Sequence, residues 1–384
     1  MPNHLCSIIT RLHTNCTVKL RVGETDIQFD STIGVKQGDN LAPILFLFMM
    51  QAVMETLEPI WPAAKLEFRT HFSDETKGRL QGQGWNTRGR IFKFWSSLYA
   101  DDAGLVVGSR QEMEKCVPVL HTHLKRFGLL MHVGSVVKKS KTEAMFCPSP
   151  GQAYEDADTS DVAADDVGGI VSFTKLFKYL GSQIDSSLRD DSDVLGRVKS
   201  AAGAFGALRE SVFGTKRIKL ETKKTVYLTL VVNILLYGSE CWCLTEALLH
   251  RLRVFHHGCV RVMLGVRRSA VWRCRIKTSK LLEEMRMETI DHYISLRKLR
   301  WAGHIARMPM DRYPRLFLTS WVRRPRPHGR PQYTFGHSLN KTLRRAGIST
   351  DFKKWRALAQ DRTPWRDLIY STAKYPPEIQ HEGS

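Results

Sequence analysis

The sequence predicts an α/β fold to about residue 190, followed by an all-helical region and a basic tail. Three observations support this prediction. In the first half of the chain, short segments with strand-like alternation or aromatic content are interspersed with helical apolar spacing. From Asp193 onward the apolar spacing is helical and remains so. Residues 247–282 contain no acidic residue, and the Pro-rich run 323–331 is strongly basic.

The first predicted elements are a strand pair and a long apolar helix. Residues 18–22 alternate as a strand does, residues 23–26 favour a turn, and residues 27–33 form the returning strand. A loop over residues 34–40 then opens a helix that extends to about Pro59. This helix is apolar on most faces, which predicts that it is buried.

An acidic turn, residues 99–102, lies between two apolar strand patterns, residues 91–98 and 103–107. The neighbouring predicted elements are a loop or irregular hairpin over 69–90, a helix over 110–127, a short strand over 143–146 and a strand or hairpin over 177–184. Residues 148–169 are acidic and rich in small side chains, which predicts a surface insertion.

The second half of the chain is predicted to be helical. Three helices are expected over residues 194–213, 219–237 and 245–264. Helix returns over residues 340–373, where Trp355 and Trp365 are expected to be core anchors. The predicted organisation is therefore residues 1–190, 191–310 and 311–384, the last combining a basic Pro-rich linker with a C-terminal helical segment.

The charge balance predicts a polyanionic partner. Of 384 residues, 58 are Lys or Arg and 38 are Asp or Glu, so the formal net charge is +20. Such a surplus is typical of proteins that bind RNA, DNA or an RNA–DNA hybrid, although a solvated basic surface would give the same composition. Backbone phosphates are expected to meet four arginines of the acid-free stretch: Arg267, Arg268, Arg273 and Arg275.

Cysteine usage and apolar runs indicate the compartment. The eight cysteines are spread thinly and form no dense disulfide framework. No basic segment followed by an apolar stretch begins the chain, so we expect no signal peptide. The longest apolar run begins at Leu41 and is shorter than the ~18–20 residues of a membrane span. We therefore expect an intracellular protein, nuclear or cytoplasmic and not secreted, without a membrane partner.

Asp101 and Asp102 are adjacent carboxylates in the predicted turn. Adjacent carboxylates repel each other unless a cation offsets the repulsion. Phosphoryl transfer by two divalent ions, about 3.5–4 Å apart, uses carboxylates to hold those ions. Taken alone, the pair also fits a solvated turn, because Asp is favoured in turns.

Four segments in order carry a family resemblance: GVKQGDNLAPILF at 34–46, YADD at 99–102, SKTE at 140–143 and FKYLGS at 177–182. They resemble motifs B, C, D and E of reverse transcriptases from non-LTR retrotransposons. Residues 236–242 and 299–304 look like the tail that often follows, so the resemblance covers most of residues 1–310. It implies an incomplete polymerase palm to about residue 190, a helical thumb-like region, and RNA-directed DNA synthesis with dNTPs and a primer–template.

The resemblance implies a role for each matching residue. Asp101 would be a metal-binding catalytic carboxylate, with Asp102 as its partner for Mg²⁺ or Mn²⁺. Lys141 would donate a proton to the leaving pyrophosphate, and a solvated surface lysine is the alternative. Gln37 and Gly38 would line the pocket for the template base and the incoming dNTP, and Tyr99 and Ala100 would lie under the primer terminus. The primer strand would be gripped by Phe177, Tyr179, Leu180 and Gly181.

The sequence departs from the family pattern at two points. The Asn that usually precedes the motif D lysine is absent from residues 128–140. Motif A, which supplies the first metal-binding aspartate, is not matched within residues 1–33, where Asp26 and Asp30 lie in the predicted strand pair. We therefore expect an N-terminally truncated enzyme that binds the cation weakly and does not extend a primer. The alternative is a non-catalytic, basic nucleic-acid-binding protein.

Two other groups of residues have both a functional and a structural interpretation. Cysteines and histidines between residues 241 and 274 lack the spacing of a CxxC zinc site, so zinc is not expected. Trp301 and Trp321 could stack on bases or belong to the core. The run 323–330 fits a solvated tail as well as a template contact.

Overall fold

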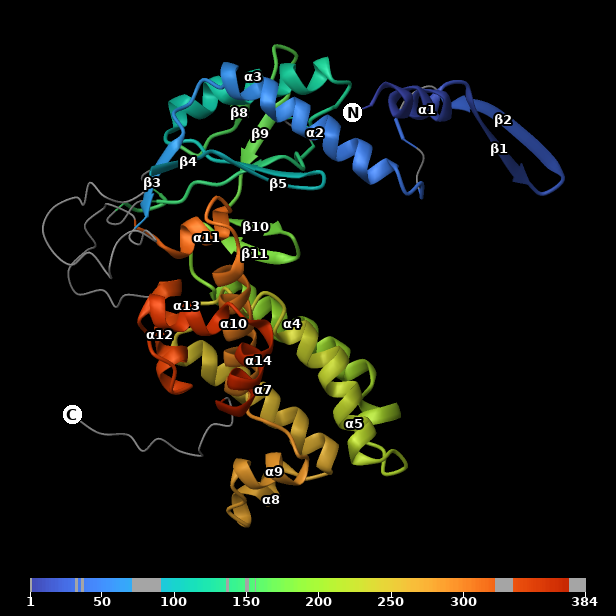
Figure 1. Ribbon diagram of the computed structural model, residues 1–384. Helices are drawn as coiled ribbons and strands as arrows, with labels where there is room; N and C mark the ends of the chain where they lie inside the picture. The colour runs from blue at the N-terminus through green and yellow to red at the C-terminus, as the bar shows by residue number, and fades with distance from the viewer. Residues whose placement is uncertain are drawn as a thin grey trace, which may run out of the picture. The chain divides into compact units, whose positions relative to one another are not determined.

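The computed structural model describes residues 2–31, 34–35, 38–70, 91–135, 138–148, 152–155, 157–321 and 334–372 (Figure 1). The chain divides into two compact units that do not follow chain order. Unit 1 comprises Met1–Leu66, Phe94–Thr142 and Asp161–Ser172. Unit 2 comprises Glu67–Lys93, Glu143–Ser160 and Phe173–Ser384. Segments distant in the sequence therefore share a unit, and the predicted boundaries near residues 190 and 310 stay predictions.

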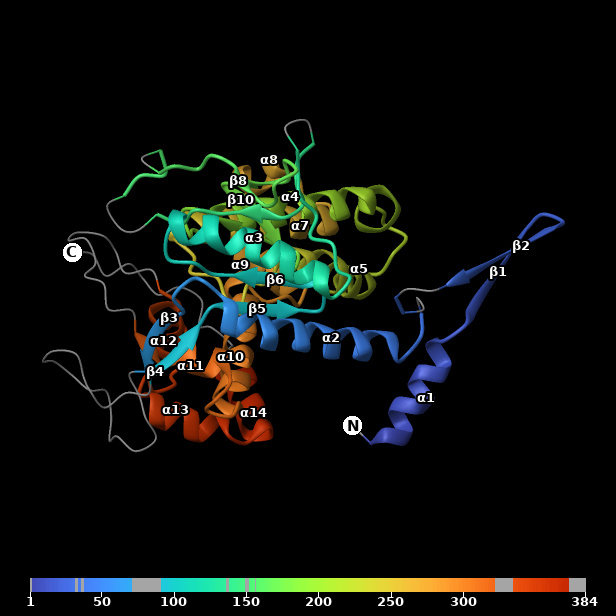
Figure 2. The ribbon, with the colours of Figure 1, turned by 90° about the horizontal axis from the view of Figure 1, so that it is seen from above.

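Unit 1 begins with helix α1, Asn3–His13, and an antiparallel hairpin of β1, Cys16–Val22, with β2, Thr25–Ser31. The predicted hairpin is thus confirmed, with Gly23 at a φ of 65° in its turn. One face of the hairpin carries five apolar side chains, and all are exposed: Val18, Leu20, Val22, Ile27 and Phe29. Figure 2 shows the hairpin standing away from the rest of its unit.

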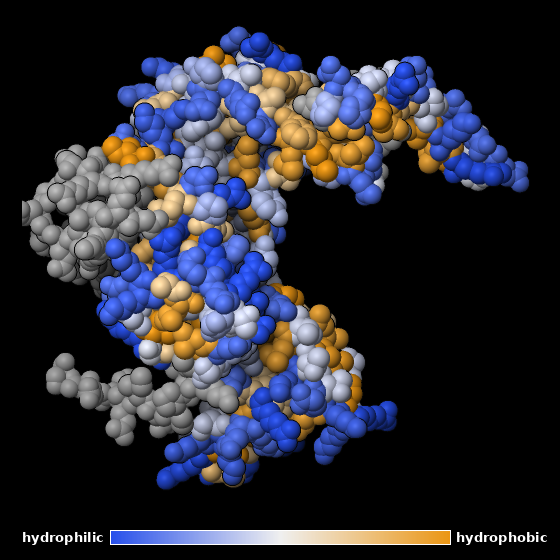
Figure 3. Space-filling model, in the orientation of Figure 1, coloured by the Kyte–Doolittle hydropathy of each residue, from blue (hydrophilic) through white to orange (hydrophobic). Residues whose placement is uncertain are grey.

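Helix α2, Ala42–Leu57, is followed by a 3₁₀ turn, Glu58–Ile60. Its start is fixed by Asp39, whose Oδ1 accepts a hydrogen bond from the Leu41 N–H at 3.0 Å. The buried residues of the helix are Ala42, Met50, Val53 and Leu57. Ile44, Leu47 and Phe48 are instead exposed, and Figure 3 shows apolar surface over this helix. The prediction that the helix is buried on most faces was therefore wrong.

Helix α3, Arg110–Arg126, packs against α2 within unit 1. Ser109 caps it by accepting the Glu112 N–H at 3.2 Å, while Glu112 Oε2 accepts the Gly108 N–H at 2.8 Å. This reciprocal arrangement satisfies two backbone donors that the helix start would leave unpaired. Buried His123 joins the two helices, because its Nε2 lies 3.0 Å from the Val53 carbonyl oxygen.

The acidic stretch 148–169 is at the surface only in part. β8, Val162–Ala163, pairs with β9, Ile170–Phe173, and lies against α3. Val162 and Ala164 are buried at 2% and 1% exposure, so this end of the stretch contributes to the core of unit 1. The prediction that the whole stretch 148–169 is a surface insertion was therefore wrong for this end. The stretch has too few apolar residues to show a helical or strand periodicity, so its burial could not be predicted from the sequence.

A three-stranded sheet in unit 2 has the order β12–β3–β4. β3 is Leu66–Thr70, β4 is Ile91–Phe94 and β12 is Ser320–Trp321. Phe68 and Phe92 stack at 5.4 Å between ring centroids, and Phe317 meets both edge-on. This aromatic group joins chain segments more than two hundred residues apart.

The main core of unit 2 is helical. Its helices are α4 (Asp191–Ala207), α5 (Leu220–Val226), α6 (Asn233–Leu235), α7 (Glu246–Leu264), α8 (Arg268–Arg273), α9 (Thr278–Glu284) and α10 (Ile290–Arg307). The three predicted helices are confirmed, but π-helical turns at Arg209–Phe213 and Tyr227–Val232 interrupt the first two. In the core Phe205 and Phe213 stack at 4.4 Å between centroids.

A second core forms on α10. It is completed by α11 (Tyr313–Leu318), α12 (Phe335–Arg345), α13 (Phe352–Ala359) and α14 (Arg362–Thr372). Trp355 and Trp365 are both 2% exposed, which confirms them as core anchors. Trp365 Nε1 donates to the Leu299 carbonyl at 3.2 Å, and its indole lies directly over Gly303. The glycine of the segment 299–304 therefore makes room for an indole.

Candidate functional site

The Tyr99–Asp102 turn closes the hairpin of β5, Ser96–Tyr99, and β6, Asp102–Leu105. Tyr99 pairs with Asp102, so Ala100 and Asp101 are the two turn residues. Ala100 has a φ of 53°, a left-handed conformation that costs energy in any residue with a Cβ. All four residues are exposed, Tyr99 at 64%. The predicted strand–turn–strand is confirmed, and the turn holds two exposed carboxylates next to a strained backbone.

The same turn does not by itself form a two-ion centre. Within the part of the chain that the structure describes, no group of three or more His, Cys, Asp and Glu side chains could hold a metal ion. Hard divalent cations need more oxygen ligands than two adjacent carboxylates offer. Asp26 and Asp30 are occupied within the β1–β2 hairpin, by Arg21 at 3.7 Å and by the Thr17 hydroxyl at 3.2 Å. The described residues therefore do not fit the implied pair of Mg²⁺ or Mn²⁺ ions.

The loop before α2 includes the residues expected to contact template base and nucleotide. Gln37 lies outside the described residues. Gly38 has a φ of 87°, and no atom lies within 4 Å of the position that a Cβ would occupy. The backbone conformation, and not a close neighbour, is thus what requires glycine here.

Lys141 lies in a loop that His132 holds in place. The Lys141 N–H donates to His132 Nδ1 at 3.1 Å, and the Ser140 hydroxyl donates to the His132 carbonyl at 2.6 Å. The Lys141 residue is exposed. Among the described residues no hydrogen bond or ion pair joins its Nζ to Asp101 or Asp102. Its role as a proton donor stays a prediction.

The residues expected to grip the primer form a tight hairpin in unit 2. β10, Leu176–Tyr179, pairs with β11, Ser182–Asp185, and Tyr179 is opposite Ser182. The two turn residues, Leu180 and Gly181, have φ values of 47° and 84°. Positive φ at both positions is the pattern of a two-residue hairpin turn whose twist matches the strands. The rings of Phe177 and Tyr179 stack at 6.4 Å between centroids.

This hairpin is fastened by residues that sequence reasoning did not single out. Tyr237 Oη donates to the Leu180 carbonyl at 2.9 Å, and Arg197 donates to the Gly181 carbonyl. The Arg197 guanidinium also lies 4.4 Å from the centroid of the Tyr237 ring. A Cβ at Gly238 would lie 2.9 Å from the Ser182 hydroxyl. The segment 236–242 is therefore the support of the 177–182 segment, which explains why Tyr and Gly are adjacent in it.

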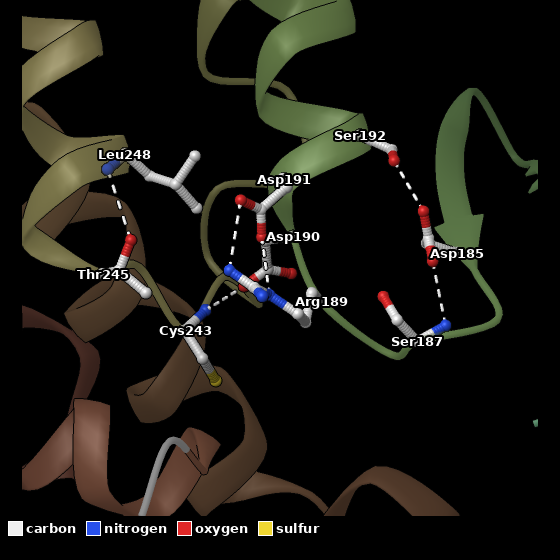
Figure 4. A network of polar contacts seen from close by, with 9 residues as sticks. All are labelled: Asp185, Ser187, Arg189, Asp190, Asp191, Ser192, Cys243, Thr245 and Leu248. Carbon is white, nitrogen blue, oxygen red and sulfur yellow. Dashed lines mark hydrogen bonds and ion pairs between the residues drawn. The ribbon is translucent and has the colours of Figure 1, made fainter. Parts of the chain in front are cut away.

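Carboxylates at the end of β11 and at the start of α4 extend the same support (Figure 4). Asp185 accepts hydrogen bonds from the Ser192 hydroxyl at 2.7 Å and the Ser187 N–H at 2.8 Å. Asp190 accepts the Cys243 N–H at 2.6 Å, and burial raises the pKa of this carboxyl. These acids are engaged with backbone and hydroxyl donors of their own unit, so they are structural acids and not free ligands.

Asp193 is the most buried carboxylate of that group, at 5% exposure. Its two oxygens accept the Trp242 Nε1–H and the Gln183 N–H, both at 2.9 Å. Burial raises the pKa of the neighbouring Cys243 thiol to about 11, so this thiol is protonated at neutral pH.

The predicted backbone-contacting arginines lie on α8 and its flanking loops. Arg267, Arg268, Arg273 and Arg275 are all exposed. None of them has an ion-pair partner among the described residues. Arg253 of the same basic stretch differs, because it pairs with Asp291 at 2.6 Å and with Glu246 at 2.5 Å. Positive charge is therefore uncompensated around α8 and compensated near the start of α7.

One segment of the described chain is long and apolar enough to cross a membrane, judged by length and composition alone. It is Ala42–Ile60, α2 with its following turn, and most of it is not buried within the structure. The helix is longer than the apolar run beginning at Leu41 suggested, because Gln51 and Glu55 are included in it. The absence of a membrane partner stays a prediction.

Comparison with known proteins gives one distant relative. No protein-family model matches the chain. A protein of Caenorhabditis elegans described as an uncharacterized transposon-derived protein is 25% identical over 276 residues. The matched region is 71% of this chain and 93% of the worm protein, so the similarity extends over nearly the whole of that relative.

Proposed function

We propose that this chain is a nucleic-acid-binding protein of transposon origin, related to reverse transcriptases of non-LTR retrotransposons, that does not extend a primer by itself. The observation that carries the proposal is the Tyr99–Asp102 turn, a strained two-residue turn with two exposed carboxylates. The similarity to a transposon-derived protein over most of the chain supports the origin. In this proposal residues 1–190 are a palm-like region and the helical core of unit 2 is the thumb-like region.

The hairpin of residues 176–185 supports the same relationship. Its aromatic face and tight turn are suited to lie against a polynucleotide strand, because stacked rings offer a flat apolar surface and the turn brings backbone amides close. Arg197 and Tyr237 hold the turn in place from within the same unit. A hairpin held in this way keeps its shape when a strand binds.

The carboxylates support the proposal that the chain does not extend a primer. Two-ion catalysis needs a carboxylate that brings both ions close and lowers the pKa of the primer hydroxyl. Asp101 and Asp102 have no third acidic partner among the described residues. The competing function is therefore an active RNA-directed DNA polymerase with dNTPs as substrates, in which a further carboxylate reaches the turn.

A primer-extension assay with the full chain distinguishes the two functions. We expect no extension on an RNA template with either Mg²⁺ or Mn²⁺. Extension that Asp101→Ala abolishes, and that Asp26→Ala leaves intact, would establish the polymerase and require a third carboxylate. Asp30 would then be the first residue to mutate.

Nucleic-acid binding is tested by its salt dependence. Each neutralised phosphate releases counterion, so affinity falls steeply as salt rises. Arg267→Ala with Arg268→Ala should flatten that dependence by removing about two phosphate contacts. The matched control removes two exposed lysines of α13, Lys353 and Lys354. No binding at low salt, or equal effects of both double variants, would contradict a localised phosphate surface around α8.

A further inference from the structure

Trp272 is an exposed aromatic residue on α8. It is 84% exposed, whereas the other tryptophans whose side chains the structure describes are half-buried or buried. These are Trp61, Trp95, Trp242, Trp301, Trp355 and Trp365. A large aromatic ring that is almost fully exposed to water does not stabilise the core. Its exposure therefore favours a role in binding a ligand.

The position of Trp272 is fixed by packing on the other side of α8. Val271 and Ile276 pack against the main helical core of unit 2, as does Val266 before the helix. The Cys274 N–H bonds to the Ala270 carbonyl at 2.9 Å, and the Ile276 N–H bonds to the Val271 carbonyl at 3.0 Å. Successive residues of a helix point about 100° apart, so anchoring Val271 turns the next side chain to solvent. The exposure therefore comes from a packed support and not from a frayed end.

Cations surround this ring along the chain. Arg268, Arg273 and Arg275 are exposed within four residues of Trp272, and Lys277 and Lys280 follow. None of the five has an ion-pair partner among the described residues. An aromatic face between uncompensated cations is the arrangement with which proteins bind single strands, because a base stacks on the ring while basic side chains meet its phosphates.

We propose that Trp272 is a base-stacking residue for single-stranded nucleic acid, with Arg268, Arg273 and Arg275 contacting the backbone on either side of the stacked base. The inference rests on the proposed function, which gives nucleic acid as the class of partner. It adds that the partner is single-stranded and that Trp272 contacts a base. A duplex keeps its bases stacked on one another, so it offers the ring no free face. A membrane surface is disfavoured because the other apolar residue of the same turn, Val271, is committed to the core.

Binding of a labelled oligonucleotide to the full chain tests this inference. The probes are an RNA and a DNA single strand of about 15 nucleotides, with one sequence, and the corresponding duplex. Trp272→Ala should weaken binding of both single strands by about tenfold or more, the effect of losing one stacked base. Trp272→Phe should keep most of the affinity, and binding of the duplex should change little in either variant.

A second readout follows the tryptophan directly. Among the tryptophans whose side chains the structure describes, Trp272 is the most exposed, so Trp272→Phe should reduce the part of the fluorescence that acrylamide quenches. A saturating single strand should protect Trp272 from the quencher, while the thermal unfolding midpoint of Trp272→Phe should change little because the side chain is 84% exposed.

The other possible outcomes distinguish a failure of base stacking by Trp272 from a failure of the proposed function. An unchanged single-strand affinity in Trp272→Ala, with a flattened salt dependence in the Arg267 and Arg268 variant, would overturn stacking and leave the proposed function standing. No binding of any of the oligonucleotides by the parent chain at low salt would overturn the proposed function as well. Equal losses on single strand and duplex, or Trp272-dependent binding to anionic phosphatidylserine vesicles in place of the oligonucleotides, would also overturn stacking.

Discussion

The N-terminal elements of unit 1 and the helical core of unit 2 contain apolar residues at similar spacing but differ in burial. On α1 the spacing of Leu5, Ile8 and Leu12 is that of a core-facing helix, yet all three are exposed. On α7 Leu249 and Leu252 are also three residues apart and Val260 continues the same face, yet all three are buried. The hairpin β1–β2 repeats the contrast, since its alternating apolar face is exposed along its whole length.

The difference shows that a periodic pattern specifies which face of an element is apolar, while a partner element decides whether the face is buried. In unit 2 the apolar stripe of α7 meets α4, α9 and α10. In unit 1 the hairpin has no extensive contact with another element among the described residues. Burial contributes roughly 25 cal/mol for each Å² of apolar surface, so the two regions should respond very differently to the same substitutions.

The largest effect is expected in the second core of unit 2. A Cβ at Gly303 would lie 2.6 Å from Cδ1 of Trp365, which is 2% exposed and hydrogen-bonded to Leu299. Gly303→Ala must displace this indole, so we expect a loss of more than about 3 kcal/mol in the free energy of unfolding. Thermal unfolding followed by near-ultraviolet circular dichroism would measure it. A variant as stable as the parent would show that the indole moves freely.

A matched pair on α2 compares burial within one helix. Leu57 is 0% exposed and Leu47 is 53% exposed. Leu57→Ala should lower the free energy of unfolding by about 2–5 kcal/mol because it leaves a cavity, whereas Leu47→Ala should cost less than about 1 kcal/mol. Denaturant titration of both variants checks the difference. Similar losses would mean that the exposed face of α2 is covered in solution.

Sequence reasoning predicted local elements better than their contacts. The hairpin of residues 16–31, the Tyr99–Asp102 turn and the anchors Trp355 and Trp365 follow from alternation, turn chemistry and helical spacing, all of which lie in a few consecutive residues. The support of Leu180 by Tyr237, at 2.9 Å, joins residues 57 positions apart. A periodic pattern within one segment does not show which distant segment packs on it. The exposure of α2 could not be predicted for the same reason, since it depends on which elements cover the helix.

The candidate site divides in the same way. The positive φ of Ala100 was not predicted, because alanine gives no signal for a left-handed turn. Trp272 was overlooked although its cue was present, namely a tryptophan within an acid-free basic stretch. The roles of Asp101, Asp102, Lys141 and the 177–181 residues come from resemblance, and only activity and binding assays test them.

A buried histidine should make the stability of the unit 2 core depend on pH. His256 is 0% exposed, with Tyr227 Oη 2.9 Å from its Nδ1 and the Glu288 carbonyl 3.1 Å from its Nε2. Burial lowers the pKa of His256 from 6.5 to about 4. Below pH 6.5 the unfolded chain therefore takes up a proton that the folded core excludes, and stability falls until about pH 4.

The loss over that window should reach about 3 kcal/mol, the equivalent of the difference between the two pKa values. His257 adds to it in the same direction, because burial and Arg261 lower its pKa as well. Chemical denaturation between pH 7 and pH 4 would measure the slope. His256→Gln should reduce the slope and His250→Gln, an exposed position on the same helix, should not. A slope unaffected by the first variant would place the titrating group elsewhere.

The smallest effect is expected at Gly203 in α4, and it has the opposite sign. Gly203 is exposed in the helix, and nothing lies within 4 Å of the position that its Cβ would occupy. Gly203→Ala should therefore raise the free energy of unfolding by about 0.5–1 kcal/mol, since alanine loses less backbone entropy in a helix and meets no neighbour. Gly303→Ala is the same chemical change in α10, so the two variants differ only in what surrounds the new methyl group. Denaturant titration of both would give opposite shifts of the midpoint if partner elements decide the outcome. A destabilising Gly203→Ala would mean that α4 has a neighbour there in solution, and that the exposed part of unit 2 is smaller than the structure indicates.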